Sequence, residues 1–313
     1  MALTWILLIV GFGLITYGAS WLTNGASAVA QRLKISEFII GMTIVAVGTS
    51  LPELTVSIAS TINGSADLAI GNIVGSNIFN ILFILGLCSV IKPIIFSRNN
   101  LRVDIVVCLA VSVLLALMLW GGSLSRIEGI VLLLLYIAII YLSIRMGKNE
   151  AIEAEEKEES SGEILPWWKS IVFICVGFAA LVYGADLTLD SAVAIARDLG
   201  ISERVIGITL LAGGTSLPEV AASLVALYKG HGAMALGNVI GSNIANILLI
   251  LGTCATISPL TMSGITAIDL GAMVAAAVIL VISALLFGYR RITRAEGVAF
   301  LVIYAAYIWY LTL

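Results

Sequence analysis

Hydrophobic residues occupy long, almost uninterrupted segments of this chain, separated by short polar stretches. Ten segments can be delimited, each near the ~20 residues that a helix needs to cross a bilayer. Their approximate ranges are 3–30, 37–62, 68–90, 102–121, 126–146, 168–195, 204–228, 234–257, 266–288 and 295–312. Several are longer than a straight crossing requires, which indicates tilted or broken helices. The pattern predicts an all-α integral membrane protein with ten transmembrane helices.

The amino-acid composition agrees with this prediction. Hydrophobic residues make up 60% of the chain and charged residues 11%, which is outside the range of soluble globular domains. The single histidine, His231, stands between two segments, where a loop position is expected. The cysteines lie inside apolar segments without the spacing of metal ligands and are interpreted as packing residues. They are Cys88, Cys108, Cys175 and Cys254.

The distribution of Lys and Arg predicts the orientation. With the N-terminus outside, only Arg126, Arg197 and Arg204 of the 16 basic residues fall in outer loops, which leaves 16 − 3 = 13 for the cytoplasmic loops. Basic residues are enriched in cytoplasmic loops. We therefore expect a multi-pass protein of the cell membrane with both termini extracellular.

One segment contains an unusual polar stretch, GMTIVAVGTSLPELTVS, at 41–57. At about 100° per residue, its small and polar residues share one helical face: Ala46, Thr49, Ser50, Glu53 and Ser57. The opposite face carries Val45, Leu51, Leu54, Val56 and Ile58. An acid in the middle of a spanning helix costs about 2.5–3.5 kcal/mol on insertion scales, so it marks a function by default. Hydroxyl and carboxylate oxygens are hard ligands that suit a cation.

The same stretch recurs at 207–223 as GITLLAGGTSLPEVAAS, displaced by 219 − 53 = 166 positions. The first segment also recurs, with Gly18 matched by Gly184, so we expect a permanent helix and not a cleaved signal. Each half holds five segments, an odd number, so the second half begins on the opposite side of the membrane. The halves are therefore predicted to be inverted repeats, which is typical of alternating-access transporters with a site near the midplane.

These repeats predict three parts in the chain. Residues 1–147 form the first five-helix repeat, 148–166 an acidic cytoplasmic linker, and 167–313 the second, inverted five-helix repeat. The linker is interpreted as a solvated tether. A weak regulatory cation site there is the alternative.

A second motif follows each carboxylate. Residues 71–77 read GNIVGSN and residues 237–243 read GNVIGSN, with Asn80 and Asn246 three residues further on. The glycines alone are typical of close helix packing. Asn72, Ser76 and Asn80 share one helical face, where neutral oxygens would complete a cation site begun by the two glutamates. The alternative is that Glu53 and Glu219 are buried, hydrogen-bonded acids that only hold helices together.

The paired G-T-S-L-P-E and G-N-x-x-G-S-N motifs resemble those of the sodium/calcium exchanger family, within the cation/Ca²⁺ antiporter superfamily, in its short prokaryotic form. The resemblance covers both halves almost end to end. It implies ten helices, of which the second, third, seventh and eighth line four central cation positions. It also implies that the first and sixth helices form the gate. It implies secondary active antiport of Na⁺ against Ca²⁺, electrogenic if more than two Na⁺ replace each Ca²⁺. We expect no cofactor, nucleic acid or obligatory protein partner.

The resemblance also implies residue roles. Glu53 and Glu219 would hold Ca²⁺ together with Thr49 and Thr215. The flanking Na⁺ positions would use hydroxyls and backbone carbonyls, from Ser50, Ser76, Ser216, Ser242, Ala46 and Ala212. Asn80 and Asn246 would lie beside the middle position.

One departure from the residues of related exchangers bears on which ions this chain transports. Some members of the family place an aspartate where this chain has Asn246, and the asparagine argues against K⁺ co-transport. The proton-coupled branch typically has G-N-A-x-E where this chain has G-T-S-L-P-E, and the hydroxyls favour Na⁺. A proton-coupled Ca²⁺ antiporter on the same fold remains the alternative. A cation channel fits inverted repeats less well, and an intramembrane enzyme lacks the expected motifs, such as His-Glu-x-x-His.

Overall fold

The computed structural model describes residues 2–97, 103–155, 165–201, 212–262, 264–287 and 291–312, and these are predominantly helical. Within these ranges, seven helices are long and apolar enough to cross a membrane, or eight if one bent pair counts as a span. The seven are Leu3–Leu33, Ala66–Ile91, Arg126–Met146, Trp167–Asp198, Gly232–Ile257, Ala267–Leu285 and Arg294–Thr312. Two shorter apolar helices are Ile105–Gly121 and Leu217–Tyr228. The chain is an all-helical membrane protein, as its hydrophobic segments predict.

Two long helical stretches form the centre of the molecule. The first consists of α5 (Ala66–Ile78), a π-helical turn η2 (Phe79–Leu85) and α6 (Gly86–Ile91). The second consists of α13 (Gly232–Ala245), a π-helical turn η6 (Asn246–Leu251) and α14 (Gly252–Ile257). In the most apolar part of these two stretches, 78% and 94% of the residues are buried, whereas in the outer span Arg294–Thr312 only 11% are buried. Single π-helical turns are frequent at functional sites, and here both interrupt the most buried helices.

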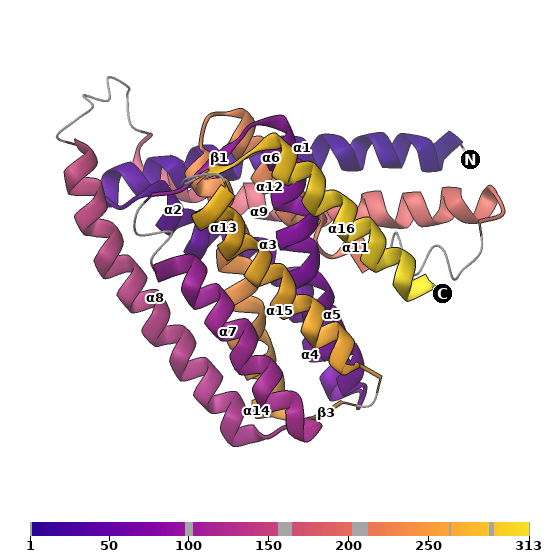
Figure 1. Cartoon of the computed structure of the whole chain (residues 1–313). Helices are drawn as coiled ribbons and strands as arrows, with labels where there is room; N and C mark the ends of the chain where they lie inside the picture. The colour runs from indigo at the N-terminus through magenta and orange to yellow at the C-terminus, as the bar shows by residue number, and fades with distance from the viewer. Residues whose placement is uncertain are drawn as a thin grey trace.

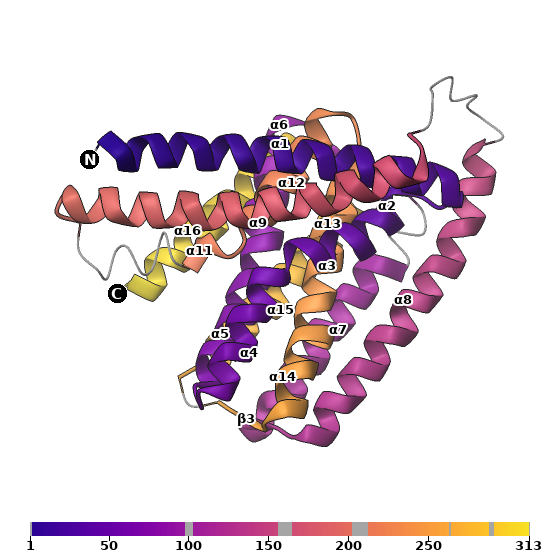
Figure 2. The ribbon, with the colours of Figure 1, turned by 180° about the vertical axis from the view of Figure 1, so that it is seen from behind.

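The helices α1 (Ala2–Leu33) and α9 (Trp167–Asp198) lie side by side and cross the remaining helices at a large angle (Figures 1 and 2). Glycines at their contact allow a close approach. A Cβ atom on Gly18 would stand 2.9 Å from the Gly177 carbonyl oxygen, and one on Gly184 would stand 3.0 Å from that of Gly11. Gly11 thus faces Gly184 and Gly18 faces Gly177, so the two helices are antiparallel. Small residues are the usual means of such packing between membrane helices.

A broken helix carries the first polar stretch. It begins with α2 (Glu37–Ile40), a π-helical turn η1 (Gly41–Val45) and α3 (Ala46–Thr49), and resumes after Ser50 as α4 (Leu51–Ile62). The two parts are bent by 46°. Pro52 stands in the first turn of α4, where its missing N–H costs no hydrogen bond. The break at Ser50 therefore lies three residues before Glu53, which stands in the first turn of α4.

The second half contains the matching break. The short helix α11 (Ala212–Gly214) ends before Thr215 and Ser216, and α12 (Leu217–Tyr228) begins with Pro218 in its first turn. Residues 202–211, which hold the start of the predicted segment 204–228, lie outside the described part of the chain. Glu219 thus occupies the first turn of its helix, as Glu53 does.

The two faces predicted for residues 41–57 are largely found. Glu53 and Ser57 are fully buried, whereas Leu51 and Val56 are each 41% exposed. Val45, which the sequence pattern places on the same face as Leu51 and Val56, is only 2% exposed. It belongs to the π-helical turn η1, which packs against α13.

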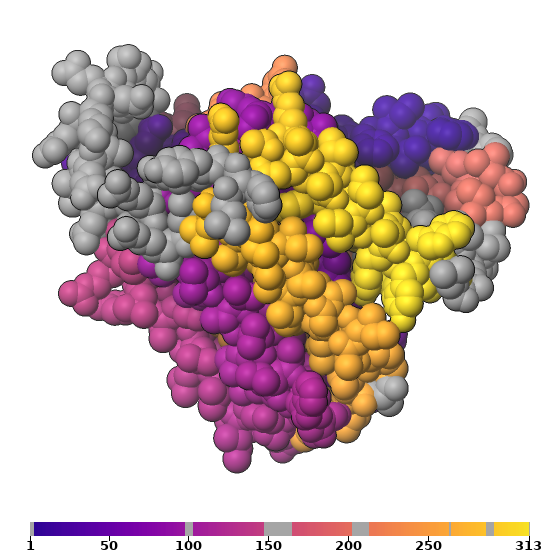
Figure 3. Space-filling view, in the orientation of Figure 1, coloured from indigo at the N-terminus to yellow at the C-terminus, as the bar shows by residue number. Residues whose placement is uncertain are grey.

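The remaining elements surround this core. They are α7 (Ile105–Met118), the 3₁₀ turn η4 (Leu119–Gly121), α8 (Arg126–Glu155), α15 (Ala267–Ile282), the π-helical turn η7 (Ser283–Phe287) and α16 (Arg294–Thr312). Two short antiparallel pairs join connecting segments: β1 (Ile94–Ile95) with β4 (Arg291–Ile292), and β2 (Ser123–Leu124) with β3 (Leu260–Thr261). Side chains of α7, α8, α15 and α16 form much of one face (Figure 3). The helix α8 extends into the predicted linker 148–166, of which 156–164 lies outside the described residues.

Polar contacts tie several of these helices together near the end of α12. The ammonium of Lys229 donates to the carbonyl oxygen of Ser20 at 3.0 Å, to the Ser20 hydroxyl at 2.6 Å and to the Asn24 Oδ1 at 2.7 Å. His231 lies in the turn before α13, as expected, and its Nδ1 is 2.6 Å from the Oε1 of Glu37. The first contact joins α12 to α1, and the second joins α13 to α2.

Candidate cation site

The two repeated carboxylates meet in the centre of the molecule. Glu53 is 0% exposed and Glu219 is 1% exposed. Each accepts a hydrogen bond from a serine of the other half. The Ser216 hydroxyl donates to Glu53 Oε1 at 2.9 Å, and the Ser50 hydroxyl donates to Glu219 Oε1 at 3.0 Å. This crossed exchange brings both helix breaks, and with them both carboxylates, together in the centre of the molecule.

Several buried oxygen atoms around this point have no hydrogen-bond partner. Within the described ranges, eight buried side-chain polar atoms lack a partner, and six of them belong to residues predicted as ligands. These six are Glu53 Oε2, Glu219 Oε2, Thr215 Oγ1, Ser242 Oγ, Asn80 Oδ1 and Asn246 Oδ1. Buried polar atoms are normally paired, because an unpaired one costs about 1–3 kcal/mol. These oxygens lie at the two helix breaks and on the two central helices that contact them, which is the arrangement expected of ligands for a cation.

Other predicted ligands are already hydrogen-bonded. The Thr49 hydroxyl donates to Asn238 Oδ1 at 3.1 Å and also lies 3.3 Å from the Ala46 carbonyl oxygen. That carbonyl accepts the backbone N–H of Ser50 at 3.0 Å as well. The Ser216 hydroxyl lies 3.3 Å from that of Ser76. Ala212, the remaining predicted ligand, begins α11.

Asn72, one of the residues predicted to supply an oxygen, and its counterpart Asn238 use their amide N–H groups to contact the helices that carry the carboxylates. The Asn72 Nδ2 donates to the Ser57 hydroxyl at 3.2 Å and to the Glu53 carbonyl at 3.4 Å. Asn238 makes the matching bonds, to Ser223 at 2.9 Å and to the Glu219 carbonyl at 3.4 Å. Each amide therefore fixes the helix that carries a carboxylate against the neighbouring central helix.

The composition of the site limits its chemistry. Across the described residues, no group of three or more His, Cys, Asp or Glu side chains could hold a metal ion. The charge of the site comes from two carboxylates, and its other ligands are hydroxyl, amide and carbonyl oxygens. Such oxygen sets suit alkali and alkaline-earth cations, whereas transition metals favour imidazole and thiolate.

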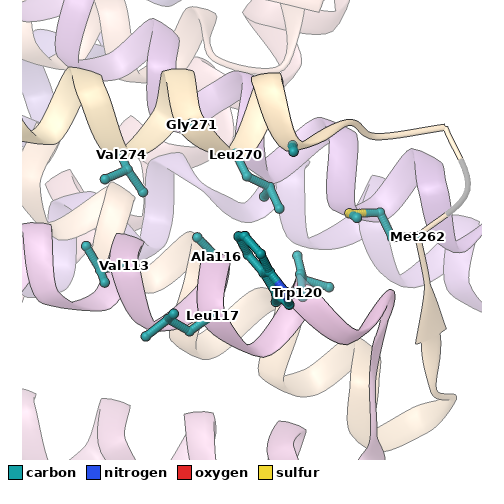
Figure 4. Close-up of a pocket in the computed structure, with 10 residues that line it drawn as sticks. Val113, Ala116, Leu117, Trp120, Met262, Leu270, Gly271 and Val274 are labelled. Carbon is teal, nitrogen blue, oxygen red and sulfur yellow. The ribbon is translucent and has the colours of Figure 1, made fainter.

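A separate cavity lies between α7 and α15, with a volume of about 420 Å³ (Figure 4). Its lining is apolar, with Trp120, Leu270 and Met262 among the larger side chains. None of the lining residues carries a charge, so this cavity does not offer ligands to a cation.

Comparison with known proteins identifies the family. The model of the sodium/calcium exchanger protein family matches residues 3–145 and 169–313. The chain belongs to the sodium/calcium exchanger family. The sodium/calcium exchanger MaX1 of Methanosarcina acetivorans is 32% identical over 347 residues, covering 98% of each chain. The inner membrane protein YrbG of Escherichia coli is 37% identical over 266 residues, covering 83% of this chain and 81% of that protein.

A solved structure supports the same assignment. The sodium-calcium exchanger NCX_Mj, soaked with 2.5 mM Na⁺ and 0.1 mM Ca²⁺, superposes with a TM-score of 0.84 at 34% identity. The match covers 98% of this chain and 97% of that chain. Exchangers of this family carry Na⁺ and Ca²⁺, so the resemblance inferred from the two paired motifs is confirmed.

Asn77 and Asn243 are the residues of the site that sequence reasoning did not single out. Both are 1% exposed and lie where α5 and α13 pass one another. Their recurrence at the same place in both repeats is the signal that could have identified them.

Proposed function

We propose that this chain is a secondary active antiporter that exchanges Na⁺ for Ca²⁺ across the cell membrane by alternating access. The observation that carries the proposal is the set of unpartnered buried oxygens around Glu53 and Glu219. A buried pair of like charges needs a compensating cation. A divalent ion neutralises both carboxylates at once, as Ca²⁺ does with oxygen ligands.

The residues divide into two proposed kinds of position. Ca²⁺ is held by Glu53 and Glu219 with the oxygens of Thr49 and Thr215. Na⁺ occupies flanking positions formed by hydroxyls and backbone carbonyls, from Ser50, Ser76, Ser216, Ser242, Ala46 and Ala212. Asn80 and Asn246 lie beside the middle position. The crossed serine–glutamate hydrogen bonds support this division, because each serine already contacts the carboxylate of the other half.

Competition for the same ligands couples the two fluxes. When Ca²⁺ holds both carboxylates, Na⁺ ions cannot use them. When several Na⁺ ions occupy the site, they recruit the flanking hydroxyls and exclude Ca²⁺. If more than two Na⁺ replace each Ca²⁺, every cycle moves net charge across the membrane, and transport is electrogenic.

We further propose ten membrane crossings in two inverted halves, 1–147 and 167–313, joined by the cytoplasmic segment 148–166. Eight spans, counting the bent pair, and the two shorter apolar helices give 8 + 2 = 10 crossings. Ten crossings return the C-terminus to the side of the N-terminus, and the positive-inside rule places that side outside the cell.

The helices α1 and α9 are the proposed gate. Their glycine contacts let them pack closely along one another, and they cross the other helices at a large angle (Figures 1 and 2). A paired unit of this kind can slide as one body over the central helices. In repeat transporters, movement of one bundle against the other exposes a fixed midplane site to each side in turn.

Uptake of Ca²⁺ into proteoliposomes tests the function. We expect uptake when Na⁺ is loaded inside and diluted outside, and little uptake when only a pH gradient is imposed. The reason is that neutral hydroxyls coordinate Na⁺, whereas a proton needs only a carboxylate. Uptake driven by a pH gradient in the absence of Na⁺ would replace this proposal by a proton-coupled Ca²⁺ antiporter.

A further inference from the structure

Four asparagines are connected by hydrogen bonds between the two central helices. The Nδ2 of Asn77 donates to the backbone carbonyl of Asn243 at 3.2 Å, and the Nδ2 of Asn243 donates to the backbone carbonyl of Asn77 at 3.3 Å. The Nδ2 of Asn246 donates to the Oδ1 of Asn77, and the Nδ2 of Asn80 donates to the Oδ1 of Asn243, each at 3.0 Å. All four side chains are 1% exposed.

The backbone carbonyls determine the orientation of all four amides. A carbonyl oxygen only accepts hydrogen bonds, so the Nδ2 atoms of Asn77 and Asn243 must face it. The Oδ1 atoms of these two residues must then face the other way, toward the Nδ2 atoms of Asn246 and Asn80. As a consequence, the Oδ1 atoms of Asn80 and Asn246 point away from Asn243 and Asn77. In the described part of the chain, these two oxygens are the buried amide atoms that have no partner.

We infer that Asn77 and Asn243 are positioning residues, which turn the amide oxygens and not the N–H groups of Asn246 and Asn80 toward the cations. The inference rests on the function proposed above. An asparagine amide has a donor end and an acceptor end of nearly equal size. If it rotated by half a turn, it would direct N–H dipoles at a cation and repel it. The hydrogen bonds from Asn77 and Asn243 prevent this rotation.

The pairing is crossed between the repeats, which makes the inference specific. Asn77 of the first half orients Asn246 of the second, and Asn243 of the second half orients Asn80 of the first. A role limited to holding α5 against α13 would couple all four residues alike. A positioning role couples only the two crossed pairs.

The same geometry accounts for the neutral residue at position 246. An ionised aspartate at position 246 would have no N–H to donate. Its oxygen would face the Oδ1 of Asn77, and two acceptors would repel each other. A neutral amide at 246 and the anchored amide at 77 are therefore a matched pair in this chain.

Double-mutant cycles test the inference with the purified full-length chain in proteoliposomes. The readouts are the Na⁺ and Ca²⁺ concentrations that give half-maximal exchange, and the maximal rate. We expect Asn77→Ala and Asn243→Ala each to raise the half-maximal concentrations about ten-fold, the effect of losing the buried hydrogen bond that orients Asn246 or Asn80. The maximal rate should stay near that of the unsubstituted chain, because the helices and the carboxylates remain in place.

The crossed pattern is the decisive readout. Asn77→Ala should add little to Asn246→Ala but its full effect to Asn80→Ala, and Asn243→Ala should behave in the opposite way. Ser112→Ala is the matched control. Its buried hydroxyl donates to the Cys108 carbonyl at 2.9 Å within α7, and its loss should leave the half-maximal concentrations unchanged.

Each outcome separates this inference from the proposed function. Absence of Na⁺-dependent Ca²⁺ exchange in the unsubstituted chain would overturn the proposed function. Normal exchange with unchanged half-maximal concentrations in Asn77→Ala would overturn the positioning role alone. Equal coupling of Asn77 to Asn80 and to Asn246 would assign it a packing role instead. If Asn77→Ala does not fold, Asn77→Ser keeps a small polar group at this position, and the same crossed pattern is expected of it.

Discussion

At the scale of single residues, each carboxylate of the site uses one oxygen for a serine and keeps the other free. Glu53 Oε1 accepts from Ser216, while its Oε2 has no partner, and Glu219 has the matching arrangement with Ser50. A carboxylate that served only to hold helices together would use both oxygens in hydrogen bonds, because unpaired buried acceptors are costly. The free oxygens therefore favour ion binding over a purely structural role.

Replacing either glutamate by glutamine tests whether its carboxylate binds the ion, because the substitution removes the charge and changes one atom. Glu53→Gln and Glu219→Gln should each reduce Ca²⁺ exchange by roughly a hundred-fold, since losing a charge-assisted contact costs about 3 kcal/mol. The serine bond can persist, because the amide oxygen of glutamine still accepts. Ca²⁺ flux in proteoliposomes is the measurement, with detergent-extracted monodisperse protein as the folding check.

Glu128→Gln is the matched control for these variants. Glu128 is partly exposed and accepts hydrogen bonds from Ser125 at the start of α8, far along the chain from either helix break. Ca²⁺ exchange by the Glu128→Gln variant should equal that of the unsubstituted chain. Near-normal exchange in Glu53→Gln or Glu219→Gln would remove that carboxylate from the site.

The sequence predicted these glutamates and serines because they recur with their whole motif in both halves. It did not predict that Asn77 would fix Asn246. Asn77 and Asn80 are both buried asparagines of one helix, and the residue pattern does not tell which of them presents a free oxygen. That depends on the carbonyl of Asn243, which only the packing of α13 against α5 brings within reach.

At the scale of elements, the site depends on helices that are interrupted where ligands are needed. The break after Thr49 places Glu53 in the first turn of α4, where the helix dipole favours a negative charge. Pro52, whose missing N–H cannot continue the hydrogen bonds of the preceding turn, marks this break in the sequence. The π-helical turns beginning at Phe79 and Asn246 could not be predicted, because no proline or unusual spacing marks them.

The contact between Lys229 and α1 predicts a conformational effect. Lys229→Met removes the three donor contacts to Ser20 and Asn24, which ought to free α1 from the end of α12. A loss of about 1–2 kcal/mol would shift a two-state equilibrium by roughly 5–30-fold. Spin labels at Tyr17 and Tyr228, both exposed, can report the distance between these helices by pulsed electron paramagnetic resonance, with the exposed Cys175 replaced by serine.

The distance distribution should gain a second population in Lys229→Met. Lys92→Met removes an exposed ammonium at the end of α6 and is the control, for which an unchanged distribution is expected. An unchanged distribution in Lys229→Met as well would mean that this contact does not hold α1 in one position.

At the scale of the whole molecule, the two halves build one site and neither completes it alone. The serine–glutamate and asparagine bonds all cross between residues about 163–169 positions apart in the chain. The segment between the halves contributes no described contact to the carboxylates. The repeat predicted the shared site, but the extension of α8 to Glu155 was not expected, since the acidic composition resembles that of a flexible linker.

Deleting residues 156–162 should therefore leave basal exchange within about two-fold of the unsubstituted chain, because these polar residues lie outside both repeats and a polar connection tolerates shortening. A variant with the same length of Gly and Ser in place of these residues separates the effect of charge from that of length. Loss of exchange in both well-expressed variants would show that the acidic residues do more than connect the halves.

The central claim is that Na⁺ and Ca²⁺ bind alternately to shared ligands. Equilibrium binding of radioactive Ca²⁺ to the purified chain, titrated with Na⁺, tests it most directly. We expect Na⁺ to displace Ca²⁺ completely and steeply, because several Na⁺ ions are needed to replace one divalent ion, and we expect Glu53→Gln and Glu219→Gln to bind almost no Ca²⁺. Ca²⁺ that stays bound at saturating Na⁺ would mean separate sites, and would contradict the proposed coupling.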